Sequence, residues 1–193
     1  MKTILQSSKI YICFVLIAVL SFFANASIAA EGFGKAEFGD SKAKVEESLG
    51  LTLQKINKYK PLYYLYYDQL YFDKSWALYS AEYLLFDKNF TVTFGFNNEG
   101  QLAQVIASYY SNKGGATVVT EAGKLRDNFE KLFMREYGTP KKNKTSSNPF
   151  DKTYNYNIEW VGKATYVKLI NVVNIEKYEL SFEVLWKWEP SPW

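Results

Sequence analysis

Apolar and polar side chains alternate along several segments of the chain, as they do in strands with one buried face. In 90–96 the phenylalanines and Val92 would point one way, and the threonines and Gly95 the other. The turn 97–100 (NNEG) then leads into the apolar run 102–110, which predicts a hairpin. The same criteria predict strands over 76–86, 154–160, 165–173 and 178–188, and the aromatic-rich run 62–72 has strand character. In the last strand, Tyr178 is expected on the apolar face with Leu180 and Phe182.

Two segments have helical spacing instead. Residues 42–49 are predicted to form a short helix. Ser41 precedes it as the N-terminal cap, and Gly50 follows it and is expected to end it. A second helix is predicted with Thr120 as its cap, ending at Gly138 and Pro140. Its apolar positions fall on one stripe: Leu125, Phe129, Leu132, Phe133 and Tyr137. The segment 141–153 that follows is polar and is predicted to be a loop.

The order of these elements predicts the fold class. A helix followed by antiparallel strands occurs twice, and a helix stripe on a sheet face is a common way to build a core. We therefore predict an α+β fold with two helix-plus-antiparallel-sheet units in tandem, each with two layers. The first unit would span residues 31–111 and the second residues 112–193.

A short motif resembles a known fold group. Residues 38–50 (FGDSKAKVEESLG) carry the spacing G-x-S-x-x-x-V-x-x-x-L-G. This spacing resembles the opening of β-lactamase-inhibitor-like domains, which include the SmpA/OmlA outer-membrane lipoproteins and the tandem-repeat β-lactamase inhibitor protein. Residues 132–140 (LFMREYGTP), followed by Trp160, look like a second copy. The chain departs from the group in lacking the lipoprotein cysteine and the inhibitor's cysteine pairs.

The resemblance implies a non-enzymatic, protein-binding role. It carries over no functional residue, because the shared motif is a structural helix cap.

The first thirty residues have the order of a secretory signal. Lys2 and Lys9 precede the apolar run 10–23, and small residues fill 24–30. A transmembrane anchor, the alternative, needs about 20 apolar residues. We expect cleavage after Ala26 or Ala30, no stable membrane anchor afterwards, and a periplasmic or secreted protein.

Charge and composition exclude several function classes. The chain has a formal charge of +3, and Lys2 and Lys9 of the signal contribute two of those charges. Basic and acidic residues are therefore nearly balanced in the rest of the chain, which argues against nucleic acid as a partner. The basic run 141–144 (KKNK) is interpreted as a solvated loop. The chain has no histidine, and its single cysteine, Cys13, lies in the signal. Cysteine nucleophiles, serine–histidine triads and the usual zinc sites are therefore excluded, and we expect a non-enzyme without a cofactor.

Carboxylates offer only weak catalytic or metal-binding candidates. Glu179 and Glu183 share one strand face, as paired catalytic carboxylates can, but alternation with Ser181 and Lys187 is also typical of a solvated face. Three aspartates, Asp68, Asp73 and Asp87, are weak candidates for a metal site. They lack the spacing and the glycine of a calcium-binding loop.

Aromatic residues supply the candidate binding site. The chain contains 16 Tyr, 14 Phe and 5 Trp, and tyrosine gives a large contact area at little entropic cost. The densest cluster consists of Tyr63, Tyr64, Tyr66, Tyr67 and Tyr71. A strand sends neighbouring side chains to opposite faces, so some of these tyrosines should be exposed, although ordinary cross-strand packing also explains such a run.

Our leading hypothesis is an exported protein-interaction module whose partner is another extracytoplasmic protein. The alternative is an extracytoplasmic carbohydrate-binding or carbohydrate-active protein that uses tyrosine platforms.

Overall fold

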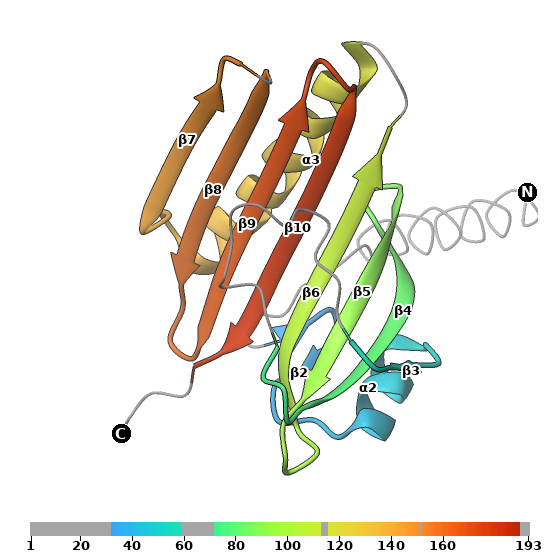
Figure 1. The fold of residues 1–193 in the computed structure, drawn as a ribbon. Helices are drawn as coiled ribbons and strands as arrows, with labels where there is room; N and C mark the ends of the chain where they lie inside the picture. The colour runs from blue at the N-terminus through green and yellow to red at the C-terminus, as the bar shows by residue number, and fades with distance from the viewer. Residues whose placement is uncertain (1–31, 59–71, 113–115, 151, 190–193) are drawn as a thin grey trace, which may run out of the picture.

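The computed structural model describes residues 32–58, 72–112, 116–150 and 152–189. An eight-stranded antiparallel sheet dominates this part of the chain (Figure 1). Its strands, in spatial order, are β3 (Gln54–Ile56), β4 (Ala77–Leu85), β5 (Lys88–Phe96), β6 (Leu102–Ser111), β10 (Glu179–Trp188), β9 (Thr165–Asn174), β8 (Thr153–Val161) and β7 (Lys142–Asn148). The remaining elements are a short ribbon, β1 (Gly32–Phe33) with β2 (Ala36–Glu37), and the helices α2 (Lys42–Leu49) and α3 (Ala116–Tyr137).

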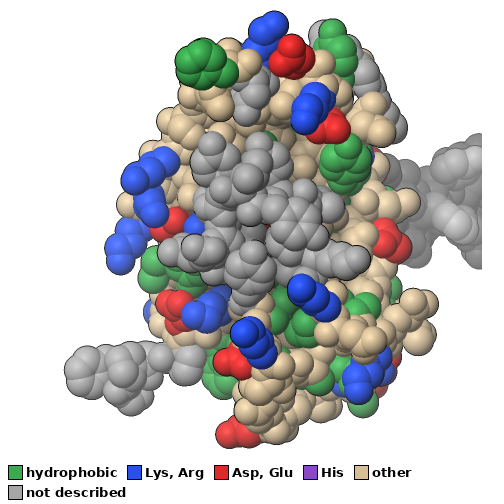
Figure 2. All heavy atoms as spheres, in the orientation of Figure 1, with side chains coloured by type: hydrophobic (Ala, Val, Ile, Leu, Met, Phe, Trp, Pro, Cys, Tyr) green, Lys and Arg blue, Asp and Glu red, His purple; other side chains and the backbone are tan. Residues whose placement is uncertain are grey.

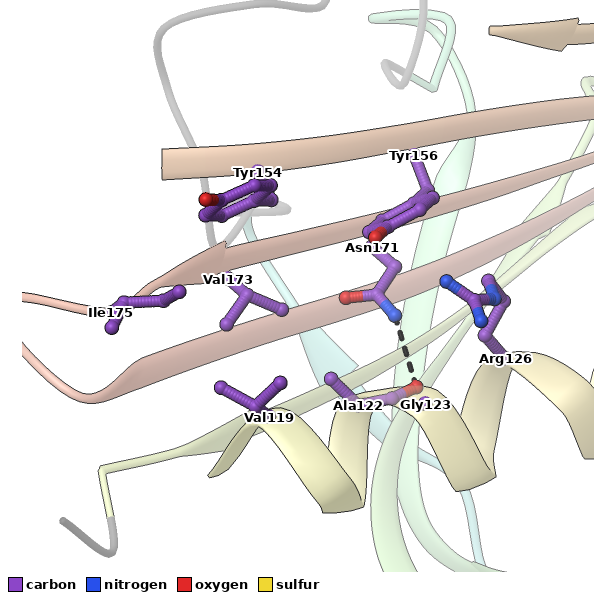
Figure 3. Close-up of a pocket in the computed structure, with 9 residues that line it drawn as sticks. All are labelled: Val119, Ala122, Gly123, Arg126, Tyr154, Tyr156, Asn171, Val173 and Ile175. Atoms are coloured by element: carbon purple, nitrogen blue, oxygen red, sulfur yellow. Dashed lines mark hydrogen bonds between the residues drawn. The ribbon is translucent and has the colours of Figure 1, made fainter. Parts of the chain in front are cut away.

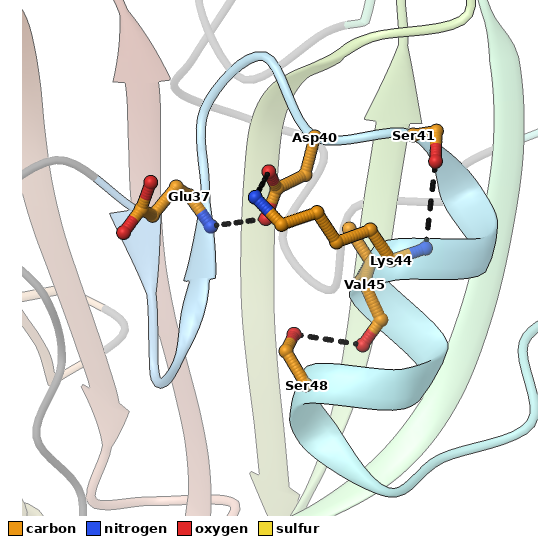
Figure 4. A network of polar contacts seen from close by, with 6 residues as sticks. All are labelled: Glu37, Asp40, Ser41, Lys44, Val45 and Ser48. Carbon is orange, nitrogen blue, oxygen red and sulfur yellow. Dashed lines mark hydrogen bonds and ion pairs between the residues drawn. The ribbon is translucent and has the colours of Figure 1, made fainter.

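Helix α2 forms where the sequence predicts it. The Ser41 hydroxyl accepts a hydrogen bond from the Lys44 amide, and Gly50 ends the helix in the left-handed conformation at φ +64°. Asp40, just before the cap, accepts from the Glu37 amide at 2.9 Å and from the Lys44 ammonium at 2.6 Å, which ties the helix to β2 (Figure 4). The helix buries only Val45, so its packing alone cannot support a sheet.

Helix α3 lies across one face of the sheet, behind β8, β9 and β10 in Figure 1. The predicted stripe is confirmed, since Leu125, Phe129, Leu132 and Phe133 are all buried. The helix begins earlier than predicted, however, so Thr120 lies inside it and does not cap it.

The apolar core on the α3 face of the sheet joins the first and last strands of the described chain. Phe33 of the β1–β2 ribbon packs edge-on against Trp186 of β10 at 5.2 Å between ring centroids. Phe129 of α3 contacts Phe90 of β5 and stacks on Phe182 of β10. The core therefore runs without a break across the predicted boundary between residues 111 and 112.

The predicted fold class is wrong. The described chain is mostly strand and is built on one sheet, and it does not form two helix-plus-sheet units in tandem. The physical reason is the pairing of β6 with β10, which extends from Leu180 opposite Ser111 to Lys187 opposite Gln104. This ladder joins strands β3 to β6 to strands β7 to β10 in one sheet, and the short α2 contributes only one buried side chain.

The strand predictions are confirmed over 76–86, 90–96, 102–110, 154–160, 165–173 and 178–188, within one or two residues at the ends. The predicted loop 141–153 is wrong, because β7 occupies Lys142–Asn148 at one edge of the sheet. Its side chains are polar and mostly exposed, so it has no apolar alternation that could have predicted it.

The face opposite α3 carries a second apolar cluster, made of Phe72, Leu78, Ile106, Ile170, Val172 and Leu185. Gly95 of β5 lies under this cluster. A Cβ atom at Gly95 would lie 2.3 Å from the Phe72 ring, so glycine is needed for this close approach. Among the described helices, none is long and apolar enough to cross a membrane.

Candidate functional site

Exposed aromatic side chains gather at one end of the sheet. The β7–β8 turn, the β9–β10 turn and the last residues of β6 lie there in one row, because Thr153 pairs with Asn174, Asn174 with Glu179, and Leu180 with Ser111. We call four side chains around this row the aromatic end: Tyr110, Phe150, Tyr154 and Tyr178. Figure 2 shows hydrophobic side chains at this end, at the top of the view, with charged side chains between them. Phe150 is 94% exposed, and the three tyrosines are 40–47% exposed.

Tyr178 holds an unusual backbone conformation at the end of the β9–β10 turn, directly before β10. Its φ is +55°, in the left-handed region, which costs a residue with a bulky side chain about 1–2 kcal/mol. Glycine or asparagine would occupy such a position at lower cost. The sequence prediction that Tyr178 lies on the core face of the last strand is therefore wrong, because the side chain stands 45% exposed in the turn before β10.

The two turns of the aromatic end are tied to each other. The Ile175 amide donates to the Lys152 carbonyl at 3.1 Å, and the Asn174 side chain donates to the Thr153 hydroxyl at 3.2 Å. Within the β9–β10 turn, the Lys177 amide donates to the Asn174 side-chain oxygen at 2.8 Å. These bonds connect Lys152 and Thr153, at the start of β8, to the β9–β10 turn that carries Tyr178.

A pocket of about 240 Å³ lies beside this end, between α3 and strands β8 and β9 (Figure 3). Tyr154 and Tyr156 of β8 line one side, and Val119, Ala122 and Gly123 of α3 line the other. The remaining lining residues are Arg126, Asn171, Val173 and Ile175. The pocket wall is thus mainly apolar and aromatic with a few polar groups, as is typical of small-molecule sites.

Asn171 is the polar group in the floor of this pocket. It is completely buried, and its amide nitrogen donates to the Ala122 carbonyl of α3 at 3.1 Å. Its amide oxygen has no hydrogen-bond partner. At the mouth, the Arg126 guanidinium lies over the Tyr156 ring at 4.5 Å from its centroid and pairs with Glu130 at 3.3 Å.

A carboxylate is buried between α3 and the sheet on the other side of the helix. Glu121 accepts hydrogen bonds from the Lys88 ammonium and, at 2.8 Å, from the Tyr109 hydroxyl. Burial alone would raise the pKa of Glu121, but the bonds from Lys88 and Tyr109 outweigh it and hold the pKa below its ordinary value. The same contacts act in the opposite direction on Tyr109, whose pKa is raised by burial and by the neighbouring carboxylate.

A second charged group is buried on the face opposite α3. Lys168 is only 2% exposed, and its ammonium lies 3.7 Å from Glu159, which also accepts a 2.9 Å bond from Lys142. Burial lowers the pKa of Lys168, and the Glu159 carboxylate opposes this change only in part. Burial, reinforced by Glu159, raises the pKa of Tyr166 beside them. Such an arrangement holds an ion pair within the sheet and presents no nucleophile to solvent.

The carboxylates singled out from the sequence do not form a site. Ser181 and Glu183 are buried, so the expectation of a solvated face is wrong at these two positions. Glu179 instead accepts a 3.3 Å bond from the Tyr110 hydroxyl at the aromatic end. Asp73 binds Ser75 within its own turn, Asp87 lies in the β4–β5 turn, and Asp68 lies outside the described residues. No group of three or more acidic, Cys or His side chains that could hold a metal ion occurs within the described ranges.

The predicted tyrosine site, Tyr63, Tyr64, Tyr66, Tyr67 and Tyr71, lies entirely outside the described residues. The aromatic end was not predicted, because two of its members lie in turns and turn residues follow no periodic pattern. The pocket left two signals in the sequence. These are a lone Asn171 within an apolar strand and a glycine, Gly123, within the second predicted helix.

No family model matches the chain, and no curated protein or solved structure is significantly similar to it.

Proposed function

We propose that this chain is an exported, non-enzymatic protein-interaction module that binds an extracytoplasmic partner protein at the aromatic end. The observation that carries the proposal is Tyr178. A large aromatic side chain stands half exposed at the last position of a turn, in a backbone conformation that glycine adopts without strain. Backbone strain of this kind clusters at active sites, ligand clamps and switch regions.

Phe150 supports the same conclusion. At 94% exposure its ring gains nothing from packing in the free chain, whereas burying a phenylalanine against a partner contributes about 1.5–3 kcal/mol. Aromatic anchors of this type dominate the affinity of many protein–protein interfaces. The bonds between the start of β8 and the β9–β10 turn reduce the ordering cost on binding, because they already hold the turn that carries Tyr178.

Photocrosslinking tests the proposal. A photoreactive phenylalanine analogue placed at position 150 or 178 should give one discrete adduct with an extracytoplasmic protein in the exporting host. Positions 134 and 161 are matched controls, because Met134 and Val161 are 53% and 47% exposed and lie away from the aromatic end. Adducts at all four positions alike, or none at 150 and 178, would contradict the proposal.

Purified components then give the magnitude. Tyr178→Gly should leave the free energy of unfolding unchanged or raise it, because the turn strain is relieved. The same variant should lose roughly thirtyfold in affinity for the crosslinked partner if Tyr178 is an anchor. Carbohydrate binding on the tyrosine run 63–71 stays a prediction from the sequence, since that run lies outside the described part of the chain.

A further inference from the structure

We infer that the pocket between α3 and strands β8 and β9 binds a compact, uncharged, mainly apolar ligand that donates a hydroxyl or N–H group to Asn171. The ligand would be the size of one aromatic ring with a substituent, as in a phenol. This inference does not depend on the protein-binding function proposed above, because it rests on Asn171 and the pocket walls, which share only Tyr154 with the aromatic end.

The need for a donor comes from the Asn171 amide. Its nitrogen is already used in fastening α3 to β9 through the Ala122 carbonyl, and its oxygen is buried without a partner. Figure 3 shows this oxygen turned away from Arg126, toward the part of the pocket flanked by Val173 and Tyr154. A buried acceptor without a partner is costly, so a ligand that supplies one donor at this point recovers that loss.

The size and polarity of the ligand follow from the walls. A cavity of about 150 Å³ lined by aliphatic and aromatic groups holds a benzene molecule, and this pocket measures about 240 Å³. Val119, Ala122 and Val173 offer only apolar contact, and the tyrosines of β8 offer ring surface. A single ring with one or two substituents therefore fills the space.

The charges around the pocket favour a neutral ligand. Arg126 is the cationic side chain of the lining, and it already pairs with Asp127 at 3.2 Å and with Glu130 at 3.3 Å. Its guanidinium is also stacked on Tyr156. With its charge compensated in this way, Arg126 offers little net attraction to an anion.

Gly123 allows the pocket to exist. It sits within α3, where glycine is unfavourable by roughly 1 kcal/mol relative to alanine, and a Cβ atom at this position would meet no atom within 4 Å. Gly123 lines the pocket, so the open space beside it adjoins the site. A larger side chain there would fill the site without disturbing the sheet.

Three matched probes test the inference on the whole chain. These are 4-methylphenol, which has a hydroxyl donor, 4-methylanisole, in which a methyl ether replaces the donor, and toluene, which has neither. NMR titration should follow the Gly123 backbone amide and the Asn171 side-chain amide. We expect saturable shifts at both groups, with 4-methylphenol binding about tenfold more tightly than the other two probes. The anion 4-methylbenzoate should bind no better than toluene.

Two variants complete the test. Gly123→Leu should abolish the shifts, and Lys131→Leu, which adds the same side chain at an exposed position of α3, should leave them unchanged. Equal binding of the three neutral probes, tighter binding of the benzoate, or binding that survives in Gly123→Leu would overturn the inference. Because the ranking of probes is measured on the unaltered chain, it decides the matter even if Gly123→Leu does not fold.

Discussion

The Glu121 carboxylate shows how one residue can link the sheet to the helix that covers it. It belongs to α3, while Lys88 and Tyr109, which donate to it, belong to β5 and β6. The side chain is 8% exposed, so its charge is stabilised mainly by these two donors.

This arrangement predicts a pH-dependent loss of stability in acid. Because the pKa of Glu121 is lower in the folded chain than the ordinary value of 4.5, the stabilisation is complete above that value and is lost as the pH falls through the lower, folded pKa. Glu121→Gln should cost about 1–3 kcal/mol at pH 7, because the charged acceptor is replaced by an amide. Urea unfolding at pH 7 and at acidic pH should show the difference between the two chains narrowing in acid.

The control for this experiment is Glu99→Gln, at an exposed position in the turn between β5 and β6. It should change the free energy of unfolding by less than about 0.5 kcal/mol at either pH. A Glu121→Gln deficit that stays constant through the acid range would mean that its charge does not stabilise the fold.

Individual exposed residues were harder to predict than buried ones. Phe129 and Phe133 were predicted as core because they repeat with the helical period, and both are fully buried. Phe150 and Tyr178 lie in turns, where exposure depends on the course of the backbone and not on any repeat. Asn171 was missed for a related reason, since its role depends on the Ala122 carbonyl, which is 49 residues away in the sequence.

Among the elements, α3 carries the aromatic centre of the core. The Phe129 ring lies within 4.8–6.4 Å, between centroids, of five other rings, from Phe86, Phe90, Phe133, Phe182 and Trp186. Those rings come from the β4–β5 turn, β5, β10 and α3 itself. Edge-to-face and stacked pairs add to the free energy that burial alone provides.

Phe129→Ala should therefore cost about 3–5 kcal/mol, because a cavity opens where these rings meet. Urea unfolding monitored by circular dichroism measures the effect. Met134→Ala, on the same helix but 53% exposed, should cost less than about 0.5 kcal/mol. A loss below about 1 kcal/mol for Phe129→Ala would show that the helix is not packed on the sheet as described.

Elements with a local signal were predictable, and those formed by pairing alone were not. The N-terminal cap Ser41 and the terminating Gly50 are local sequence signals, and α2 forms between them as predicted. The edge strand β7 pairs only with β8 and buries no apolar face, so its existence depends on backbone hydrogen bonds to a neighbour. Lysine at such an edge also discourages pairing with other chains.

For the molecule as a whole, the pairing of β6 with β10 makes the sheet one unit. The sequence indicated each of these strands but not their partnership, because a periodic pattern identifies a strand and not its neighbour. Ser108 and Glu183, which meet across this ladder, are 75 residues apart in the sequence. Two separate sheets and one continuous sheet have the same local patterns, and the error in the fold class came from this ambiguity.

A continuous sheet predicts that the chain unfolds in one step. Native-state hydrogen exchange should give the same opening free energy for core amides of β5, such as Val92, and of β9, such as Leu169. Val184→Ala in β10 should lower both values equally. If β5 exchanged at a clearly lower free energy than β9, residues 31–111 would be opening independently of the rest.

The position of β10 also determines the order in which the fold can form during synthesis. It is the last strand in the described chain, yet it lies between β6 and β9 in the sheet. While a ribosome is still making residues 179–188, both neighbours have unpaired edges, and the core lacks Phe182 and Trp186. A growing chain cannot complete this sheet before β10 has been made. Under the export proposed above, such a delay would keep the chain in a translocatable state until β10 has been made.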